Sequence, residues 1–188
     1  MTEEIMDDEL KAEEIELDQY LVFTVKDQEF GFQARRVQEI LSVTGTTKVP
    51  NAPSHIEGIM NLRGRLATVI NFRKKFGFEQ IEHDEDTRII IVEQSGFPIG
   101  IVVDAVEEVI KIPDNSVHEL PKSARVPGSE ECITGVGMLK NRLIILLDID
   151  RVLTGQELIE AGAISQMMEK VIKGRKSGAE EETNIEGA

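Results

Sequence analysis

Few side chains of this chain have the types and spacing that catalysis requires. Asp148 and Asp150 are separated by one residue, so an extended strand would place both carboxylates on one side, where a pair could serve as general acid and base. No nucleophile or base accompanies this pair in the sequence. We therefore predict that the protein is not an enzyme, and we keep a hydrolase that uses Asp148 and Asp150 as the alternative from another functional class.

Metal and nucleotide chemistry also lack their usual residues. The three histidines are far apart and show no HExxH spacing: His55, His83 and His118. Two glycine-containing stretches, 96–100 and 135–137, lack the lysine and hydroxyl residue of a phosphate-binding loop. Cys132 is the single cysteine, and a nucleophilic role would need a base beside it. We predict no catalytic residue, no cofactor and no metal site.

The negative charge of the chain is concentrated at its ends. The formal net charge is −14, and residues 1–18 alone carry nine acids and one base. Nucleic-acid affinity depends on basic surfaces that neutralise phosphates, so we predict no nucleic-acid partner. The start of the chain lacks the regions of a signal peptide, and no apolar run approaches the ~20 residues of a membrane helix. We expect a cytoplasmic protein without membrane insertion.

An internal repeat organises the middle of the chain. Residues 20–42 align with residues 89–111 at a constant offset of 69, and residues 58–76 align with residues 135–153 at an offset of 77. The aligned positions include glycines and arginines as well as apolar residues. Because chance rarely matches glycines and polar residues in order, the pattern predicts two copies of one small domain.

Each copy has the pattern of a small β-barrel. Short β-branched runs begin at Tyr20, Phe30 and Leu66 and recur at Ile89, Ile99 and Leu143. Tight polar turns, Arg63-Gly64 in one copy and Lys140-Asn141 in the other, precede the last strand. These features predict a mainly all-β fold of two barrels of about five strands each, in lobes of about 19–80 and 88–155.

Helices should be few and should lie at the ends of the copies. Short helical turns are expected at 71–76 and 148–153. Thr154-Gly-Gln-Glu157 has the form of a capping box, and apolar residues at helical spacing follow it, which predicts a C-terminal helix over 156–173. The acidic leader 1–18 and the tail 174–188 bury too little apolar surface to order, so we expect both to be disordered.

One turn carries a residue suited to binding. Arg63 lies in a turn whose duplicate carries Lys140, so the turn itself does not require arginine. A solvated turn residue and a site for a protein partner are both compatible with the sequence. Arginine is well suited to capturing carboxylates and is enriched at the centres of protein interfaces.

Several stretches taken together resemble the CheW family, the coupling proteins of bacterial and archaeal chemotaxis. The matching stretches occur in order and span about 19–155: Gln19–Phe23, Phe30–Phe32, Val37–Ile40, Val49–Pro53, Ile56–Gly58, Asn61–Gly64, Gly100–Asp104 and Ile133–Gly137. The resemblance implies two SH3-like five-stranded barrels. It also implies a non-enzymatic scaffold, associated with receptor arrays at the membrane, that joins chemoreceptor cytoplasmic tips to the regulatory domain of the histidine kinase CheA.

The resemblance also assigns candidate partner-binding residues. In the family, the positions that match Val37, Glu39, Gly58 and Arg63 affect coupling. The first barrel is expected to meet the kinase and a groove between the barrels to take the receptor tip. This chain departs from the family at Thr68 and Asn71, where Pro and Asp are usual, so partner contacts of those two residues are in question.

Two further functions are compatible with these residues. One is a CheW-like coupling subunit of a gliding or pilus chemosensory system, which the sequence does not distinguish from a flagellar one. The other is a regulatory domain that binds a small molecule between its lobes.

Overall fold

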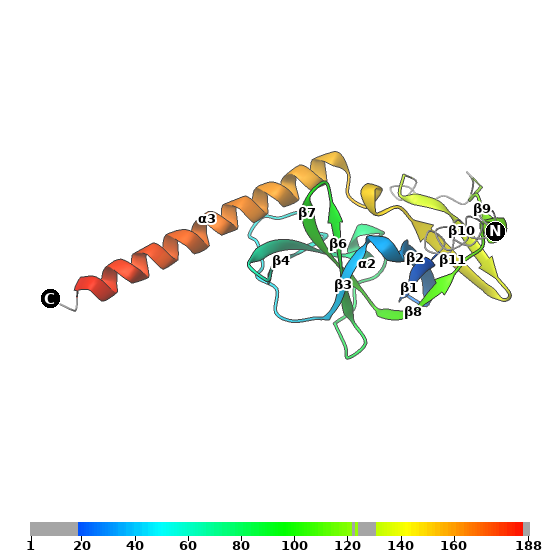
Figure 1. The fold of residues 1–188 in the computed structure, drawn as a ribbon, viewed down its shortest axis with the longest axis horizontal. Coiled ribbons are helices and arrows are strands. Elements are labelled where there is room, and N and C mark those ends of the chain that lie inside the picture. Colours follow the sequence, from blue (N-terminus) through cyan, green and yellow to red (C-terminus); the bar gives the residue numbers. More distant parts are fainter. Residues whose placement is uncertain (1–18, 122, 124–130, 186–188) are drawn as a thin grey trace, which may run out of the picture.

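The computed structural model describes residues 19–121, 123 and 131–185, and it shows a two-lobed β-body with one long helix at its C-terminal end (Figure 1). The leader 1–18, which we expected to be disordered, lies outside the described residues. Strand is the commonest secondary structure in the described residues, as the alternating and β-branched patterns predict.

Eleven strands and a few short helices follow one another in the described residues. The first half contains β1 (Gln19–Val25), β2 (Gln28–Gln33), β3 (Val37–Ser42), β4 (Ile56–Leu62) and β5 (Arg65–Asn71). The second half contains β6 (Arg88–Gln94), β7 (Phe97–Val103), β8 (Ala105–Lys111), β9 (Val117–His118), β10 (Ile133–Leu139) and β11 (Arg142–Leu147). The helical elements are η1 (Ala34–Arg36), α2 (Phe72–Lys75), η2 (Asp114–Ser116), η4 (Ile149–Arg151) and α3 (Gly155–Ile185).

The strands form two sheets of matching order, which confirms the duplication. The first sheet has the order β3-β6-β7-β5-β4, and the second has β8-β1-β2-β11-β10-β9. In both sheets the last hairpin pairs in parallel with a strand of the other copy, β5 with β7 and β11 with β2. Register shifts also recur at duplicate positions, between Ile56 and Gly58 in β4 and between Ile133 and Gly135 in β10.

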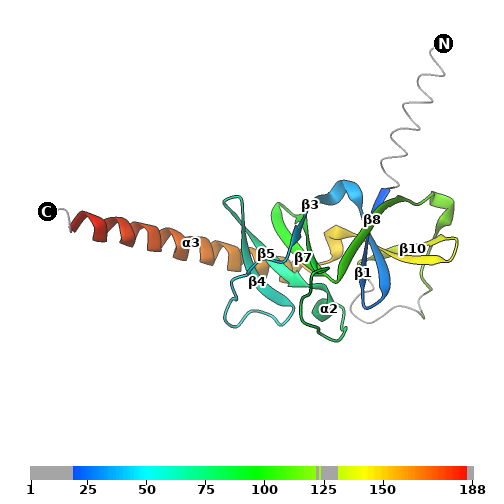
Figure 2. The same cartoon turned by 90° about the horizontal axis from the view of Figure 1, so that it is seen from below.

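The two copies exchange their first hairpins. The hairpin β1–β2 of the first copy lies in the second sheet, and β6–β7 of the second copy lies in the first sheet. The expected lobes of about 19–80 and 88–155 therefore do not correspond to the sheets. Each sheet is assembled from both halves of the chain, as the mixed colours of each lobe in Figure 2 show.

Short links explain the exchange. Only Asp104 separates β7 from β8, and only the three residues of η1 separate β2 from β3. For β8 to pair with β6 in one sheet, the chain would have to return over a full strand length, because β8 would run parallel to β7. A parallel crossover needs about a dozen residues, whereas one residue spans at most ~3.6 Å. The chain therefore passes directly from one lobe into the other.

The main hydrophobic core joins the two sheets. It contains buried residues from β1 and β2 of the second sheet together with residues from β5, β6 and β7 of the first. Four phenylalanines are its largest members, and their rings are in mutual contact: Phe23, Phe30, Phe32 and Phe72. Each sheet also has a smaller cluster of its own. Because the largest core is shared, the two lobes form one folding unit.

The helical elements agree with the sequence except at the C-terminus. The turns α2 and η4 lie at duplicate positions, and the capping box is present, with the Thr154 amide donating to Glu157 Oε2 at 2.7 Å. Helix α3, expected to end at residue 173, runs to Ile185, so residues 174–185 are helical and not disordered as predicted. No proline interrupts this segment, and its run of Glu180–Glu182 favours helix. Within the described ranges, no helix is long and apolar enough to cross a membrane.

Candidate partner-binding site

The four residues implicated by the family resemblance lie on or beside the first sheet. Val37 and Glu39 belong to β3, which forms one edge of that sheet. Gly58 belongs to β4, which forms the other edge, and Arg63 lies in the turn between β4 and β5. The sheet therefore divides the candidate site between its two edges.

The structure brings Arg63 and Glu39 into direct contact. Nη2 of Arg63 donates to Oε2 of Glu39 at 3.1 Å. Since Arg63 extends from the tip of the β4–β5 hairpin and Glu39 lies on β3, this ion pair connects the two edges of the sheet. The sequence separation of 24 residues gave no indication of the contact.

Local turn geometry places Arg63 at the tip of the hairpin. Arg63 and Gly64 both have left-handed backbone angles, with φ of 52° and 86°. Two consecutive left-handed residues are typical of the tightest hairpin turns. The Asn61 side chain closes this turn, because its Oδ1 accepts a hydrogen bond from the Gly64 amide at 2.8 Å. Arg63 is therefore presented outward by its backbone conformation.

The ion pair leaves most of Arg63 free to bind. The side chain of Arg63 is 83% exposed, while that of Glu39 is 23% exposed. An exposed ion pair contributes only ~0–1 kcal/mol to stability, so the contact orients Arg63 more than it holds the fold together. Guanidinium carries five N–H donors, and within the described part of the chain this one contacts only Glu39. The remaining donors could bind a carboxylate or a carbonyl of a partner.

Strand β3 adds an apolar residue that sequence reasoning did not place in the site. Val37 and Glu39 are half-buried, and Val37 packs against the main core. Ile40 points the other way and is 40% exposed. The alternation of β3 was readable from the sequence and could have identified Ile40, because alternate strand residues face opposite sides. Its duplicate, Val109, is exposed in the same way.

Gly58 is required by the backbone around it. Its φ is 156°, and a Cβ at this position would lie 2.3 Å from the carbonyl oxygen of Thr47. Thr47 pairs with Ile59 through two backbone hydrogen bonds of 2.8 and 2.9 Å. Any side chain on residue 58 would displace this loop segment from β4. Gly58 therefore shapes the edge of the sheet and does not itself offer a contact to Arg63.

The duplicate of this site uses a different pairing. Glu108, which corresponds to Glu39, accepts a hydrogen bond from Arg142 at 2.5 Å, and Arg142 also binds Glu29 at 2.6 Å. The hydrogen bonds of these carboxylates, first that of Glu29, raise the pKa of Arg142 above its ordinary value. Lys140, which corresponds to Arg63, therefore does not take the role of Arg63. The two lobes present different charged surfaces despite their common fold.

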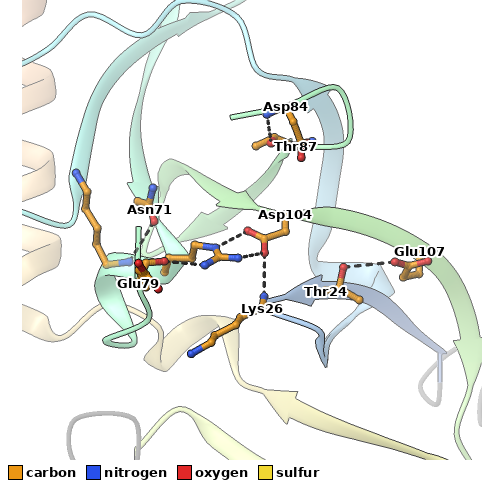
Figure 3. A network of polar contacts seen from close by, with 10 residues as sticks. Thr24, Lys26, Asn71, Glu79, Asp84, Thr87, Asp104 and Glu107 are labelled. Carbon is orange, nitrogen blue, oxygen red and sulfur yellow. Dashed lines mark hydrogen bonds and ion pairs between the residues drawn. The ribbon is translucent and has the colours of Figure 1, made fainter. Parts of the chain in front are cut away.

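A partly buried polar network connects the two lobes on another side (Figure 3). Arg73 at α2 donates to both carboxylate oxygens of Asp104, at 2.8 and 2.6 Å, and the Lys26 amide donates to Asp104 at 2.8 Å. Burial alone would raise the pKa of Asp104, but the hydrogen bonds from Arg73 and from the Lys26 amide bring it below its ordinary value. Arg73 also binds the Glu79 carbonyl, so it fixes the start of the connector between the copies.

The pair of carboxylates considered for catalysis has structural partners. Asp148 accepts a hydrogen bond from the Asp150 amide at 2.9 Å and so caps η4. Asp150 binds Arg36 through two hydrogen bonds of 2.8 and 2.5 Å, and the hydrogen bond from Arg36 lowers the pKa of Asp150. These contacts give both carboxylates a structural role.

Cys132 is unsuited to nucleophilic attack. It is 3% exposed, and burial raises the pKa of its thiol to about 11. The thiol is therefore protonated near neutral pH, whereas the thiolate is the reactive form. Within the described part of the chain, no group of three or more His, Cys, Asp or Glu side chains is arranged to hold a metal ion.

Two cavities have linings in which some of the polar side chains already have partners within the chain. One, of about 720 Å³, lies between the loop before β4 and the connector near His83. There Glu57 accepts a hydrogen bond from Asn71 at 2.6 Å and pairs with His83 at 3.0 Å. The other, of about 250 Å³, lies where the lobes meet and is lined by Arg35 together with the Arg36–Asp150 pair.

The two departures from the family pattern have roles within the chain. Thr68 is buried, and its hydroxyl donates to the Ala161 carbonyl at 3.2 Å and lies 3.1 Å from Ser165 Oγ, both on α3. Proline at this position could not make these contacts. Asn71 caps α2 by accepting a hydrogen bond from the Lys74 amide at 3.1 Å. Both residues therefore serve the local fold and the attachment of α3.

Comparison with known proteins gives matches over the two-lobed β-body. The family model described as "CheW-like domain" matches residues 19–157. "Chemotaxis protein CheW" of Klebsiella aerogenes is 34% identical over 140 residues, covering 74% of this chain and 84% of that protein. "Chemotaxis protein CheW" of Helicobacter pylori is 28% identical over 135 residues, covering 72% and 81%.

A solved structure shares the fold. The crystal structure of the scaffolding protein TtCheW from Thermoanaerobacter tengcongensis superimposes with a TM-score of 0.68 at 33% sequence identity. The match covers 74% of this chain and 96% of that one. The paired sheets are thus common to both proteins, and about a quarter of this chain lies outside the matched region.

Proposed function

Since the chain belongs to the CheW-like domain family and is a chemotaxis scaffold by that membership, we propose that it couples chemoreceptors to the histidine kinase CheA. The observation that carries this proposal is the exposed guanidinium of Arg63, which Glu39 orients at the edge of the first sheet. Neither the ion pair nor the turn requires arginine for stability, so we attribute Arg63 to the binding of a partner.

The first surface is proposed to bind the regulatory domain of CheA. It consists of the Arg63–Glu39 ion pair and of Ile40, the exposed apolar residue that follows Glu39 on β3. An arginine with unused donors and an exposed apolar residue on the same edge of the sheet match the composition of interface centres, where apolar contacts and arginine hydrogen bonds both contribute. Val37 and Gly58 position this surface without being part of it. Val37 packs against the main core, and Gly58 allows the loop at Thr47 to lie close to β4.

The second surface is proposed to bind the receptor tip at the junction of the lobes. The cavity beside Arg35 and Arg36 opens where η1 passes from the second sheet to the first. Because η1 and the main core fix the two lobes in one arrangement, a helix bound at the junction and a domain bound at β3 would be held at a constant geometry. Coupling then needs rigidity and two contacts, and no bond is made or broken.

Binding of a purified CheA regulatory domain tests the first surface. We expect Arg63→Glu to weaken binding at least tenfold by calorimetry, equivalent to ~1.4 kcal/mol, because the reversed charge repels the carboxylate that Arg63 would bind. The melting temperature should change little, since an exposed side chain contributes less than ~0.5 kcal/mol to stability. The matched control is Lys140→Glu, which reverses the charge at the duplicate turn and should bind normally.

Two results would contradict this assignment. Normal binding by Arg63→Glu would remove Arg63 from the interface, and equal losses for Arg63→Glu and Lys140→Glu would indicate a general charge effect. Receptor binding is measured separately, with a soluble receptor signalling fragment and the variant Arg35→Glu. We expect that variant to lose receptor and to keep kinase, and the opposite pattern would exchange the two surfaces.

A further inference from the structure

Most of helix α3 lies outside the part of the chain that the family shares. The family match ends at residue 157, whereas α3 runs from Gly155 to Ile185. TtCheW is covered over 96% of its own length by only 74% of this chain. Helix α3 is therefore an addition to the scaffold, and the scaffold function proposed above does not account for it.

The first part of α3 is firmly attached to the body. Glu157 binds Lys75 of α2 at 2.5 Å, and Thr68 of β5 contacts Ala161 and Ser165. Gly162 allows the close approach of Phe97, because a Cβ there would lie 3.3 Å from the ring. These contacts fix the direction in which the helix leaves the body.

Beyond Ser165 the helix carries apolar side chains that the body does not cover. Met167, Val171 and Ile172 are 50%, 44% and 40% exposed. Figures 1 and 2 both show this part of α3 projecting away from the sheets, so the two views agree that it leaves the body. We define residues 166–185 as the distal segment of α3.

An unsupported helix of this kind is not expected to be stable alone. Isolated helices of ~12–15 residues are marginal in water, and most helical stability in proteins comes from packing an apolar face. The distal segment contains Gly174 and Gly178, each of which lowers helix stability by ~1 kcal/mol relative to alanine. A packing partner would supply the missing stability.

The order of charges along the distal segment indicates which partner fits. Residues 169–176 contain four basic residues and one acid, whereas residues 177–185 contain three acids and no base. A second copy running antiparallel places the basic stretch of each helix beside the acidic stretch of the other. A parallel copy would instead place like charges side by side, which is unfavourable.

We propose that the distal segment of α3 is a self-association site that pairs antiparallel with the same segment of a second copy. The contact is isologous, so a single surface serves both molecules and closes as a dimer with twofold symmetry. In this pair the stretch that contains Val171 and Ile172 lies beside the acidic stretch of the partner helix, so carboxylates added there would be repelled. Two scaffolds are thereby joined end to end, with their sheets and their Arg63 surfaces on opposite sides of the dimer centre.

Sedimentation equilibrium of the full chain tests the proposal. We expect a dimer that dissociates on dilution and weakens at high salt. The double variant Val171→Glu with Ile172→Glu should raise the dissociation constant at least tenfold. The matched control is Ile159→Glu, which changes another exposed apolar residue of α3, 74% exposed, in the attached part of the helix.

Charge exchange distinguishes the antiparallel pair from other associations. Lys170→Glu with Lys173→Glu should weaken self-association, and so should Glu180→Lys with Glu181→Lys. Combining all four substitutions in one chain should restore self-association, because the exchanged stretches again lie beside opposite charges only when the helices run antiparallel. A chain that stays monomeric throughout, or a fourfold variant that shows no recovery, would overturn the proposal.

Discussion

Arg73 and Asp104 form a two-bond ion pair across the junction of the lobes, and Asp150, at the position equivalent to Arg73, forms a two-bond pair with Arg36, one residue after the position equivalent to Asp104. Residues 73 and 150 occupy equivalent positions at the offset of 77, so one copy supplies the cation and the other the anion. Each copy therefore contributes to an ion pair at this junction, with opposite charges at positions 73 and 150. The two pairs differ in burial, since the side chains of Arg73 and Asp104 are 11% and 24% exposed and those of Arg36 and Asp150 are 33% and 56%.

The more buried pair should matter more for stability. We expect Asp104→Asn to lower the free energy of unfolding by ~2–3 kcal/mol, because it leaves the Arg73 guanidinium largely buried without a counter-ion. Asp150→Asn, the matched control in the more exposed pair, should cost under ~1 kcal/mol. Urea denaturation followed by circular dichroism measures both. Equal losses for the two variants would contradict the assigned role of burial.

Acid should destabilise the fold in two stages. Burial lowers the pKa of His55 below its ordinary value of 6.5, so its contribution is present above pH 6.5 and declines as pH falls, because the unfolded chain takes up the proton first. The carboxyls of Asp104, Asp150 and Glu157 also have lowered pKa values. Their contribution is present above the unfolded values near ~4 and is lost at lower pH.

Replacing His55 separates these stages. Nε2 of His55 is buried and lies 3.3 Å from Glu157 Oε1 without hydrogen-bond geometry, which agrees with a neutral ring. In His55→Gln the free energy of unfolding should change little between pH 7 and pH 5, while the loss below pH ~4 persists. Thermal melts at each pH measure this stability. If His55→Gln lost as much stability between pH 7 and pH 5 as the unsubstituted protein, His55 would not titrate on unfolding.

Substitution of Gly58 should lower the stability of the fold. We expect Gly58→Ala to lower the free energy of unfolding by ~1–3 kcal/mol, because its Cβ collides with the Thr47 carbonyl. Gly45→Ala is the matched control in the same region, since no atom lies within 4 Å of its added Cβ. Chemical denaturation compares them. A Gly58→Ala protein as stable as Gly45→Ala would show that the loop at Thr47 accommodates a side chain at residue 58.

Cleavage of the connector should not separate the lobes. If a protease site is introduced at residues 80–86 and cut, both fragments should elute together in native gel filtration, because β6–β7 lies between β3 and β5 in the first sheet. The shared core of Phe23, Phe30, Phe32 and Phe72 holds the fragments as well. Two fragments that elute separately as folded units would show that each half completes its own barrel.

The sequence alone was sufficient for the repeating unit and its local structure. Strand periodicity, the turns at Arg63 and Lys140 and the capping box at Thr154 are all encoded within a few residues, and the structure confirms them. The order of motifs along the chain also indicated the family. Features of this kind can be predicted from the sequence because backbone conformation and capping depend on near neighbours in the chain.

Only the tertiary structure decided which copy completes which sheet and which charges meet. The two hairpins β1–β2 and β6–β7 carry equivalent patterns, so pattern alone assigns neither to a sheet. The decision rests on Asp104, the single residue between β7 and β8, which leaves no length for a return crossover. The contact of Arg63 with Glu39 and the attachment of α3 at Thr68 depend in the same way on three-dimensional approach between segments distant in sequence.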